Sequence, residues 1–228
     1  MQNLSAEMDF AKIIEDADRL LTSAIDQDKS KITQKVGNDT FKERIFQQID
    51  NPVEILGIQT GINFFDISFD GIVPGLLTLV GGRPGTGKSA LNQNILYQVS
   101  VLRQTPILLV DTETSSKFVE DRLLAIASGL GYNDITHGRI SKDILEPYID
   151  AIQAAPIYYT YMPDINAKEL KLICRKYKKA YGIEAVIIDF LGGSDAEKAH
   201  IEIGKKVKAM HDIGTTLDLG FVVFQQLN

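Results

Sequence analysis

Eight consecutive residues have the types and spacing needed to hold a chain of phosphates. They fit the pattern G-x-x-x-x-G-K-[ST] and are Gly82, Arg83, Pro84, Gly85, Thr86, Gly87, Lys88 and Ser89. The glycines leave the loop bare, so that backbone N–H groups can approach phosphate oxygens closely. We expect Lys88 to reach the β- and γ-phosphates of ATP, and the Ser89 hydroxyl to bind Mg²⁺.

The segments on either side of this loop are the ones that a phosphate loop requires. Leu76–Val80 is a short apolar run typical of a buried strand, and Ser89–Arg103 has a helical pattern. A helix that begins at the loop directs its free N–H groups and the positive end of its dipole at the phosphates. The alternative is a glycine-rich strand-to-helix turn around no ligand, but the four fixed positions should arise by chance in a chain of this length only about one time in a hundred.

Alternating strand and helix patterns continue along the chain, which predicts an α/β fold with a mostly parallel sheet between helices. The expected strands are Leu76–Val80, Pro106–Asp111, Ile157–Tyr161, Ala185–Asp189 and Phe221–Gln225. The expected helices are Ser89–Arg103, Ser116–Gly129, Lys142–Ala154, Ala167–Tyr181 and Ala196–Leu217. Ligands of such sheets bind beyond the carboxyl ends of the strands, so polar residues at these ends are the candidates for chemistry.

Polar residues do follow three of the expected strands. Asp189 ends an apolar strand, the arrangement in which a carboxylate holds Mg²⁺ near the phosphate-loop hydroxyl. Glu113 is our candidate for the base that activates water, although it precedes a helix and a capping role is open. Asp111 is the rival base. Gln226 ends the last strand, where its amide either contacts the γ-phosphate or lies on the surface.

Composition limits the class of protein. The chain has 228 residues, a formal net charge of −6 and one cysteine, Cys174, so an internal disulfide is impossible. It lacks an apolar run long enough for a bilayer and the features of a signal peptide, which predicts a cytoplasmic protein. The expected helix Ala167–Tyr181 is rich in lysine; a solvated outer helix is favoured over a nucleic-acid face.

The first part of the chain has a different pattern. Apolar residues recur at helical spacing over residues 4–28, and a second helix is expected over Thr40–Ile49. Asn51-Pro52 then marks a boundary. We therefore expect an N-terminal helical linker over residues 1–52 and an ATPase domain over 53–228. The first helix either packs on its own domain or docks on a neighbouring subunit.

Several motifs together resemble the ATPase domain of the DnaB-like replicative helicases of bacteria and phages. They are Gly57-Ile58-Gln59-Thr60-Gly61, Phe65-Asp66, Gly71, the phosphate loop with Arg83-Pro84, Glu113, Thr136–Ile140, Ile187–Leu191 and Val223–Asn228. The resemblance implies a RecA-like fold in which Lys88 and Ser89 bind phosphate and Mg²⁺. It also implies that Glu113 is the catalytic base, Asp189 the metal residue and Gln226 the γ-phosphate sensor.

The resemblance further implies a hexameric ring that pulls single-stranded DNA through its centre. ATP would lie between subunits, with a primase or a helicase loader as partner, in a bacterial cell or the host cytoplasm of a phage. Too little chain precedes residue 53 for the family's N-terminal domain, and the chain stops after the sensor strand, which suggests a C-terminally truncated domain. The alternatives are a RecA-like ATPase of recombination or clock type, and an ATP-gated assembly module without unwinding activity.

Overall fold

The computed structural model describes residues 16–20, 36–37, 39–191 and 199–227. The chain divides into two units, Met1–Val53 and Glu54–Asn228, which are considered separately. In the first unit, residues 16–20 are helical and α2 spans Asp39–Asp50. This agrees with the helix expected over Thr40–Ile49. Most of the helix expected over residues 4–28 lies outside the described residues.

The second unit is built on a parallel sheet of five strands in the order β1-β5-β4-β2-β3. The strands are β1 (Leu77–Gly82), β2 (Ile107–Asp111), β3 (Ile157–Tyr161), β4 (Ala185–Leu191) and β5 (Gly220–Gln226). All four neighbouring pairs are parallel. All five expected strands are thus confirmed, and their carboxyl ends share one edge of the sheet, where the phosphate loop also begins.

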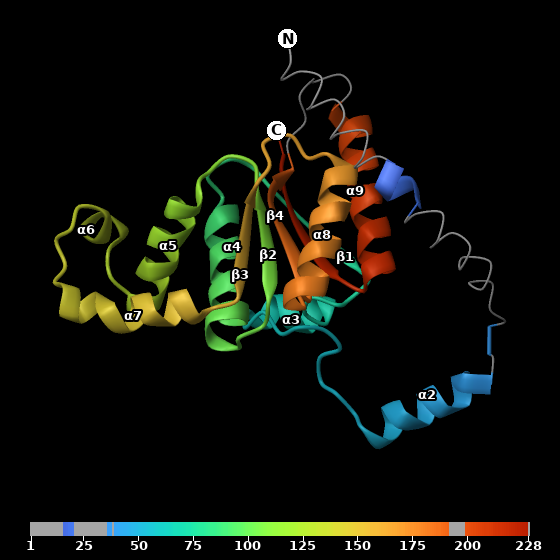
Figure 1. The fold of residues 1–228 in the computed structure, drawn as a ribbon. Coiled ribbons are helices and arrows are strands. Elements are labelled where there is room, and N and C mark those ends of the chain that lie inside the picture. Colours follow the sequence, from blue (N-terminus) through green and yellow to red (C-terminus); the bar gives the residue numbers. More distant parts are fainter. Residues whose placement is uncertain (1–15, 21–35, 38, 192–198, 228) are drawn as a thin grey trace, which may run out of the picture. The chain divides into compact units, whose positions relative to one another are not determined.

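Helices cover both faces of this sheet (Figure 1). They are α3 (Asn63–Phe69), α4 (Lys88–Leu96), the π-helix η1 (Tyr97–Leu102), α5 (Ser116–Ser128), α6 (Tyr132–Thr136), α7 (Lys142–Ala154), α8 (Ala167–Tyr181) and α9 (Ala199–Leu217). One apolar core joins α8 and α9 to the sheet. A second core joins α3, α4, η1 and α5 to the opposite face. Within the described residues, no helix has the length and apolar character needed to cross a membrane.

The inward face of α8 agrees with the solvated outer helix expected from the sequence. Leu170 and Cys174 are fully buried, and Ile173 and Tyr177 pack against the same core. Asn166 caps the helix, because its side-chain oxygen accepts hydrogen bonds from the backbone N–H groups of Lys168 and Glu169. Lys168, Lys176 and Lys179 are exposed on the outer side of α8, whereas Lys171 and Lys178 are half-buried.

Two short helices and the π-helix differ from the sequence expectation. Helix α3 has seven residues and α6 has five, too few for a helical period to stand out from the surrounding loops. The loop before α3 is held by the buried Asp66 carboxylate, which accepts hydrogen bonds from Thr60 and Gly61. The expected helix Ser89–Arg103 is present, but its second half winds as η1.

Candidate nucleotide-binding site

The loop between β1 and α4 is closed by bonds to the carbonyl of Arg83. The Thr86 hydroxyl donates to this carbonyl oxygen at 2.7 Å, and the Thr86 N–H donates to it at 3.3 Å. A Cβ atom at Gly82 would lie 2.8 Å from Thr86 Oγ1, so a larger residue at position 82 would displace the hydroxyl that closes the turn. Gly87 has a φ of +91°, which glycine adopts without strain, and this residue starts α4.

The N-terminus of α4 is open towards a ligand. No side chain caps Gly87, so the first N–H groups of the helix remain available to an anion. The Lys88 ammonium arches back over the loop and donates to the carbonyl oxygens of Gly82 at 2.9 Å and Arg83 at 3.0 Å. The loop thus carries a positive charge at the place where the helix offers free donors.

Asp189 lies near the end of β4, directly beside the start of α4. Its carboxylate is 8% exposed and accepts a hydrogen bond from Asn92 Nδ2 at 3.0 Å. Burial raises the pKa of Asp189, and the nearby Asp111 charge adds to the rise. Hydrogen bonds from Asn92 and Ser89 lower the pKa, as does the charge of Arg122. The hydroxyl and the carboxylate expected to share a metal ion are therefore in contact.

Asp111 and Glu113 have different roles in the structure. Asp111 is 4% exposed, and its Oδ1 accepts the backbone N–H groups of Glu113 at 2.8 Å and Thr114 at 2.7 Å. Its Oδ2 accepts the Thr114 hydroxyl at 2.6 Å. The Glu113 side chain, by contrast, is exposed and lines the cleft next to the phosphate loop. Asp111 thus holds the turn that carries Glu113, and the Glu113 side chain is the one of the two that reaches the cleft.

Hydrogen bonds tie the ends of neighbouring strands into two groups. The Thr112 N–H donates to the Asp189 carbonyl at 3.0 Å, and the Thr112 hydroxyl donates to the Phe190 carbonyl at 3.0 Å, which joins β2 to β4. The Leu227 N–H donates to the Gly82 carbonyl at 3.0 Å, which joins the end of β5 to the phosphate loop. Between β4 and β5 the register shifts in the segment Ile188 to Leu191.

These groups meet around one cleft of about 600 Å³. The expected site residues that line it are Pro84, Gly85, Gly87, Lys88, Ser89, Glu113, Asp189 and Gln226. Gly82, Arg83 and Thr86 are not among the lining residues; they form the turn beneath it. Every residue expected to handle the metal, the water or the γ-phosphate therefore faces the same space.

Several residues that line or support the cleft were not expected from the sequence. Arg122 of α5 and Tyr132 of α6 line it, and Asn92 supports Asp189 from beneath. An arginine about two helical turns into the helix after Glu113 was a usable signal, since α5 starts at the sheet edge where the ligand binds. The sequence gives no signal for Asn92, because its hydrogen-bond partner, Asp189, lies 97 residues away in the chain.

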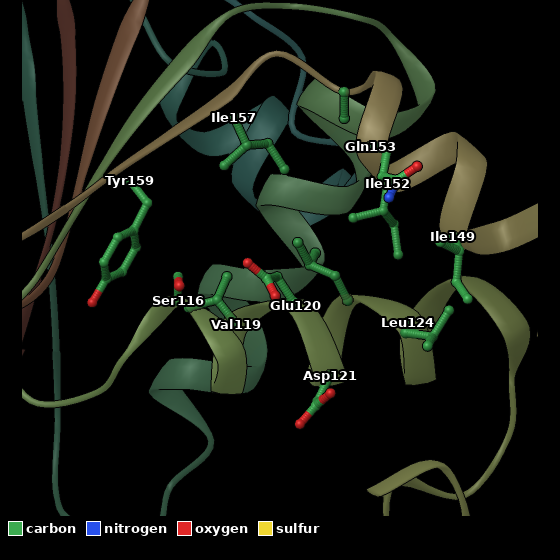
Figure 2. A pocket seen from close by; sticks show the side chains of 12 residues that line it. Ser116, Val119, Glu120, Asp121, Leu124, Ile149, Ile152, Gln153, Ile157 and Tyr159 are labelled. Carbon is green, nitrogen blue, oxygen red and sulfur yellow. The ribbon is translucent and has the colours of Figure 1, made fainter. Parts of the chain in front are cut away.

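A second hollow, of about 470 Å³, lies between α5, α7 and β3 (Figure 2). Apolar side chains from both helices, among them Val119, Leu124 and Ile152, point into it. Its charged lining residues are Glu120 and Asp121. Since two carboxylates repel phosphate, this hollow does not suit a nucleotide, and the cleft at the phosphate loop remains the candidate site.

The fold and the cleft define a P-loop NTPase of RecA-like architecture. The donors of the cleft match a nucleotide with Mg²⁺: an ammonium and free N–H groups for phosphates, and a hydroxyl beside a carboxylate for the metal. A Cβ at Gly85 or Gly87, which line the cleft, would meet no atom of the chain within 4 Å, so the loop is bare on the side where phosphates would approach.

Within this class, the chain belongs to the family of DnaB-like helicase C-terminal domains, which it matches over residues 57–228. It is 24% identical to the replicative DNA helicase DnaB of Leifsonia xyli subsp. xyli, over 75% of this chain and 39% of that protein. It is 22% identical to the replicative DNA helicase DnaB of Geobacillus stearothermophilus, over 94% of this chain and 51% of that protein. The chain thus spans about half, or less, of the length of these curated relatives.

Solved structures show the same fold. A DnaB-like replicative helicase, described together with its interactions with primase, aligns with a TM-score of 0.72 at 18% identity, over 91% of this chain and 52% of that one. The ATPase domain of another protein aligns with a TM-score of 0.75 at 19% identity, over 86% of this chain and 72% of that one. The RecA-like fold expected from the sequence is therefore confirmed.

Proposed function

We propose that this chain is the ATPase motor domain of a replicative DNA helicase, which couples ATP hydrolysis to translocation on single-stranded DNA and to duplex unwinding. The observation that carries the proposal is the meeting of Lys88, Ser89, Glu113, Asp189 and Gln226 in one cleft. Membership of the DnaB-like helicase family supports the DNA substrate.

The phosphate loop and β4 supply the binding half of the reaction. Free N–H groups at the start of α4 and the Lys88 ammonium would hold the β- and γ-phosphates of ATP. To reach them, Lys88 exchanges its two carbonyl partners for phosphate oxygens. Ser89 and Asp189 would hold Mg²⁺, which when bound neutralises charge on the phosphate oxygens.

Glu113 and Gln226 would supply the groups that act during hydrolysis itself. The Glu113 carboxylate would accept a proton from the attacking water, a role that typically contributes a factor of about 10² to 10⁴ in rate. Three hydrogen bonds to Asp111 hold the turn on which Glu113 stands. Gln226 ends β5 beside the phosphate loop, where its amide would contact the γ-phosphate and transmit its loss.

The assembly is part of the same proposal. We propose a hexameric ring around single-stranded DNA, with ATP bound between subunits and residues 1–52 serving as a helical linker to the ATPase domain, residues 53–228. A primase is the favoured partner, because a similar solved helicase is described with its interactions with primase; a helicase loader is the other candidate. Such a motor works on DNA in the bacterial cytoplasm, or in the host cytoplasm if a phage encodes it.

The test is release of phosphate from Mg-ATP by the full chain, with and without single-stranded DNA, together with strand displacement from a forked duplex. We expect Glu113→Gln to reduce the rate by about 10²-fold or more. The matched control is Glu120→Gln, an exposed glutamate of α5 that lines the second hollow instead. If single-stranded DNA leaves the rate of hydrolysis unchanged and no strand is displaced, the helicase function is refuted and a RecA-like switch is favoured. Nucleotide-dependent assembly without hydrolysis would favour an assembly module.

A further inference from the structure

The side chain of Asn92 connects α4 to the carboxylate at the end of β4. Its Nδ2 donates to Asp189 Oδ2 at 3.0 Å, and its own side chain is 1% exposed. Ser89 stands three residues earlier on the same helix, so both side chains leave α4 on one face. One helix therefore presents two hydrogen-bond donors, a hydroxyl and an amide, to the same carboxylate.

Asn92 is a costly residue to place here. Its Oδ1 is buried and, within the part of the chain that the structure describes, has no hydrogen-bond partner. A buried carbonyl without a partner destabilises a fold, and an apolar residue would avoid that cost. Its neighbours Ile95 and Leu96 on α4 are apolar and fully buried. The amide therefore has to be explained by its donor, which is directed at Asp189.

The Asp189 carboxylate needs such a donor because of its surroundings. Asp111 is the register partner of Asp189 on β2, so two buried acids stand on adjacent strands. Their charges repel each other, and without a restraint the Asp189 side chain could rotate away. The bond to Asn92 engages Oδ2 and so restrains the rotation of the carboxylate.

We propose that Asn92 is a positioning residue for the metal ion. Its amide fixes Oδ2 of Asp189, so that the remaining oxygen and the Ser89 hydroxyl together receive the hydrated Mg²⁺ of the nucleotide. Asn92 itself touches neither the metal nor the nucleotide. The inference rests on the proposed function, because it takes Ser89 and Asp189 as the metal-binding pair.

The experiment separates metal binding from nucleotide binding in the full chain. Binding of Mn²⁺ to the protein with ADP is followed by the loss of the free Mn²⁺ signal in electron paramagnetic resonance. Binding of a fluorescent ADP is measured in EDTA. We compare Asn92→Ala and Asn92→Leu with Asn63→Ala, which removes an exposed asparagine at the start of α3 that does not line the cleft.

We expect both Asn92 variants to bind Mn²⁺ roughly 10- to 100-fold more weakly, the range typical for removing a partner that orients a metal ligand. Affinity for ADP in EDTA stays within about twofold, and Asn63→Ala behaves like the unmodified protein. Asn92→Leu also removes the orphaned oxygen while it fills the space. This gain offsets part of the loss of the hydrogen bond to Asp189, so Asn92→Leu should still unfold cooperatively, yet fail to restore Mn²⁺ binding.

Three results would overturn the proposal. Unchanged Mn²⁺ affinity in both Asn92 variants would show that Asp189 needs no help from the amide. An equal loss of ADP affinity in EDTA would point to general damage of the cleft, and loss of cooperative unfolding in both variants would assign Asn92 to the core. If the unmodified protein binds no Mn²⁺ with ADP, the proposed function itself fails, which is a different result.

Discussion

Replacement of Asp111 by asparagine tests which of two neighbouring acids is the base. Asp111 is 4% exposed and accepts three hydrogen bonds, from the Glu113 N–H, the Thr114 N–H and the Thr114 hydroxyl. Asp111→Asn keeps the Oδ1 carbonyl that serves both N–H groups. It removes the negative charge and turns the acceptor at Thr114 into a donor.

The expected magnitude follows from these contacts. A hydrogen bond to a charged group contributes about 1.5–3 kcal/mol, and bonds that share one carboxylate do not add fully. Because two of the three bonds survive in weakened form, we expect Asp111→Asn to lower the free energy of unfolding by about 1–2 kcal/mol. Relief of the repulsion with Asp189 offsets part of the loss. Asp111→Ala, which removes all three bonds, should cost about 3–5 kcal/mol.

The assay pairs urea unfolding with phosphate release. If Asp111 only holds the turn, Asp111→Asn slows hydrolysis by a few-fold, because Glu113 is held less firmly. Glu113→Gln should remove a factor of about 10² to 10⁴ and barely change stability, because its side chain is exposed. The assignment is wrong if Asp111→Asn abolishes hydrolysis without loss of stability while Glu113→Gln remains active.

Three further predictions test other parts of the fold. Gly82→Ala puts a Cβ within 2.8 Å of Thr86 Oγ1, so ATP should bind roughly tenfold more weakly, by equilibrium dialysis, and wild-type affinity would contradict the tight turn. Asn166→Ala removes the cap of α8 and should lower the free energy of unfolding in urea by about 1 kcal/mol; no change would show that the cap contributes little. Burial raises the pKa of Cys174 to about 12, so the thiol stays protonated at pH 8, and iodoacetamide should label the folded protein far more slowly than the protein in urea. Because the pKa of the Cys174 thiol is higher in the folded protein, its contribution to the free energy of unfolding is complete below the unfolded pKa of about 8.5. This contribution is lost as the pH rises towards 12. A urea midpoint of unfolding that stays constant above pH 9 would contradict this prediction.

Much of the fold could be predicted because its strongest signals are local. The range expected for β3, Ile157–Tyr161, and those for α7 and α8 agree with the structure at both ends. Apolar runs and helical periods are properties of neighbouring residues, and packing on the sheet follows them here. Helices α3 and α6 were not predicted because each is shorter than two helical turns. The start of α3 depends on the hydrogen bonds of Asp66, and the start of α6 depends on Gly131.

The site was predictable only where a motif carries its own spacing. The phosphate loop, Glu113, Asp189 and Gln226 could be named because each stands at the end of an expected strand, and parallel strands share that edge. The choice between Glu113 and Asp111 needed the hydrogen bonds of Asp111, which depend on how the turn folds. Asn92 and Arg122 lie inside ordinary helical patterns, and only the packing of α4 and α5 against the cleft reveals them.

The pairing of strand ends divides the proposed site residues into two groups with a seam between β4 and β5. Glu113 and Asp189 belong to one group, since Thr112 fastens β2 to β4. The phosphate loop and Gln226 belong to the other, and the register between the two groups shifts between Ile188 and Leu191. The bond from Asn92 to Asp189 bridges the seam. The contact between α4 and β4 therefore fixes the spacing of the two groups where they meet at the cleft.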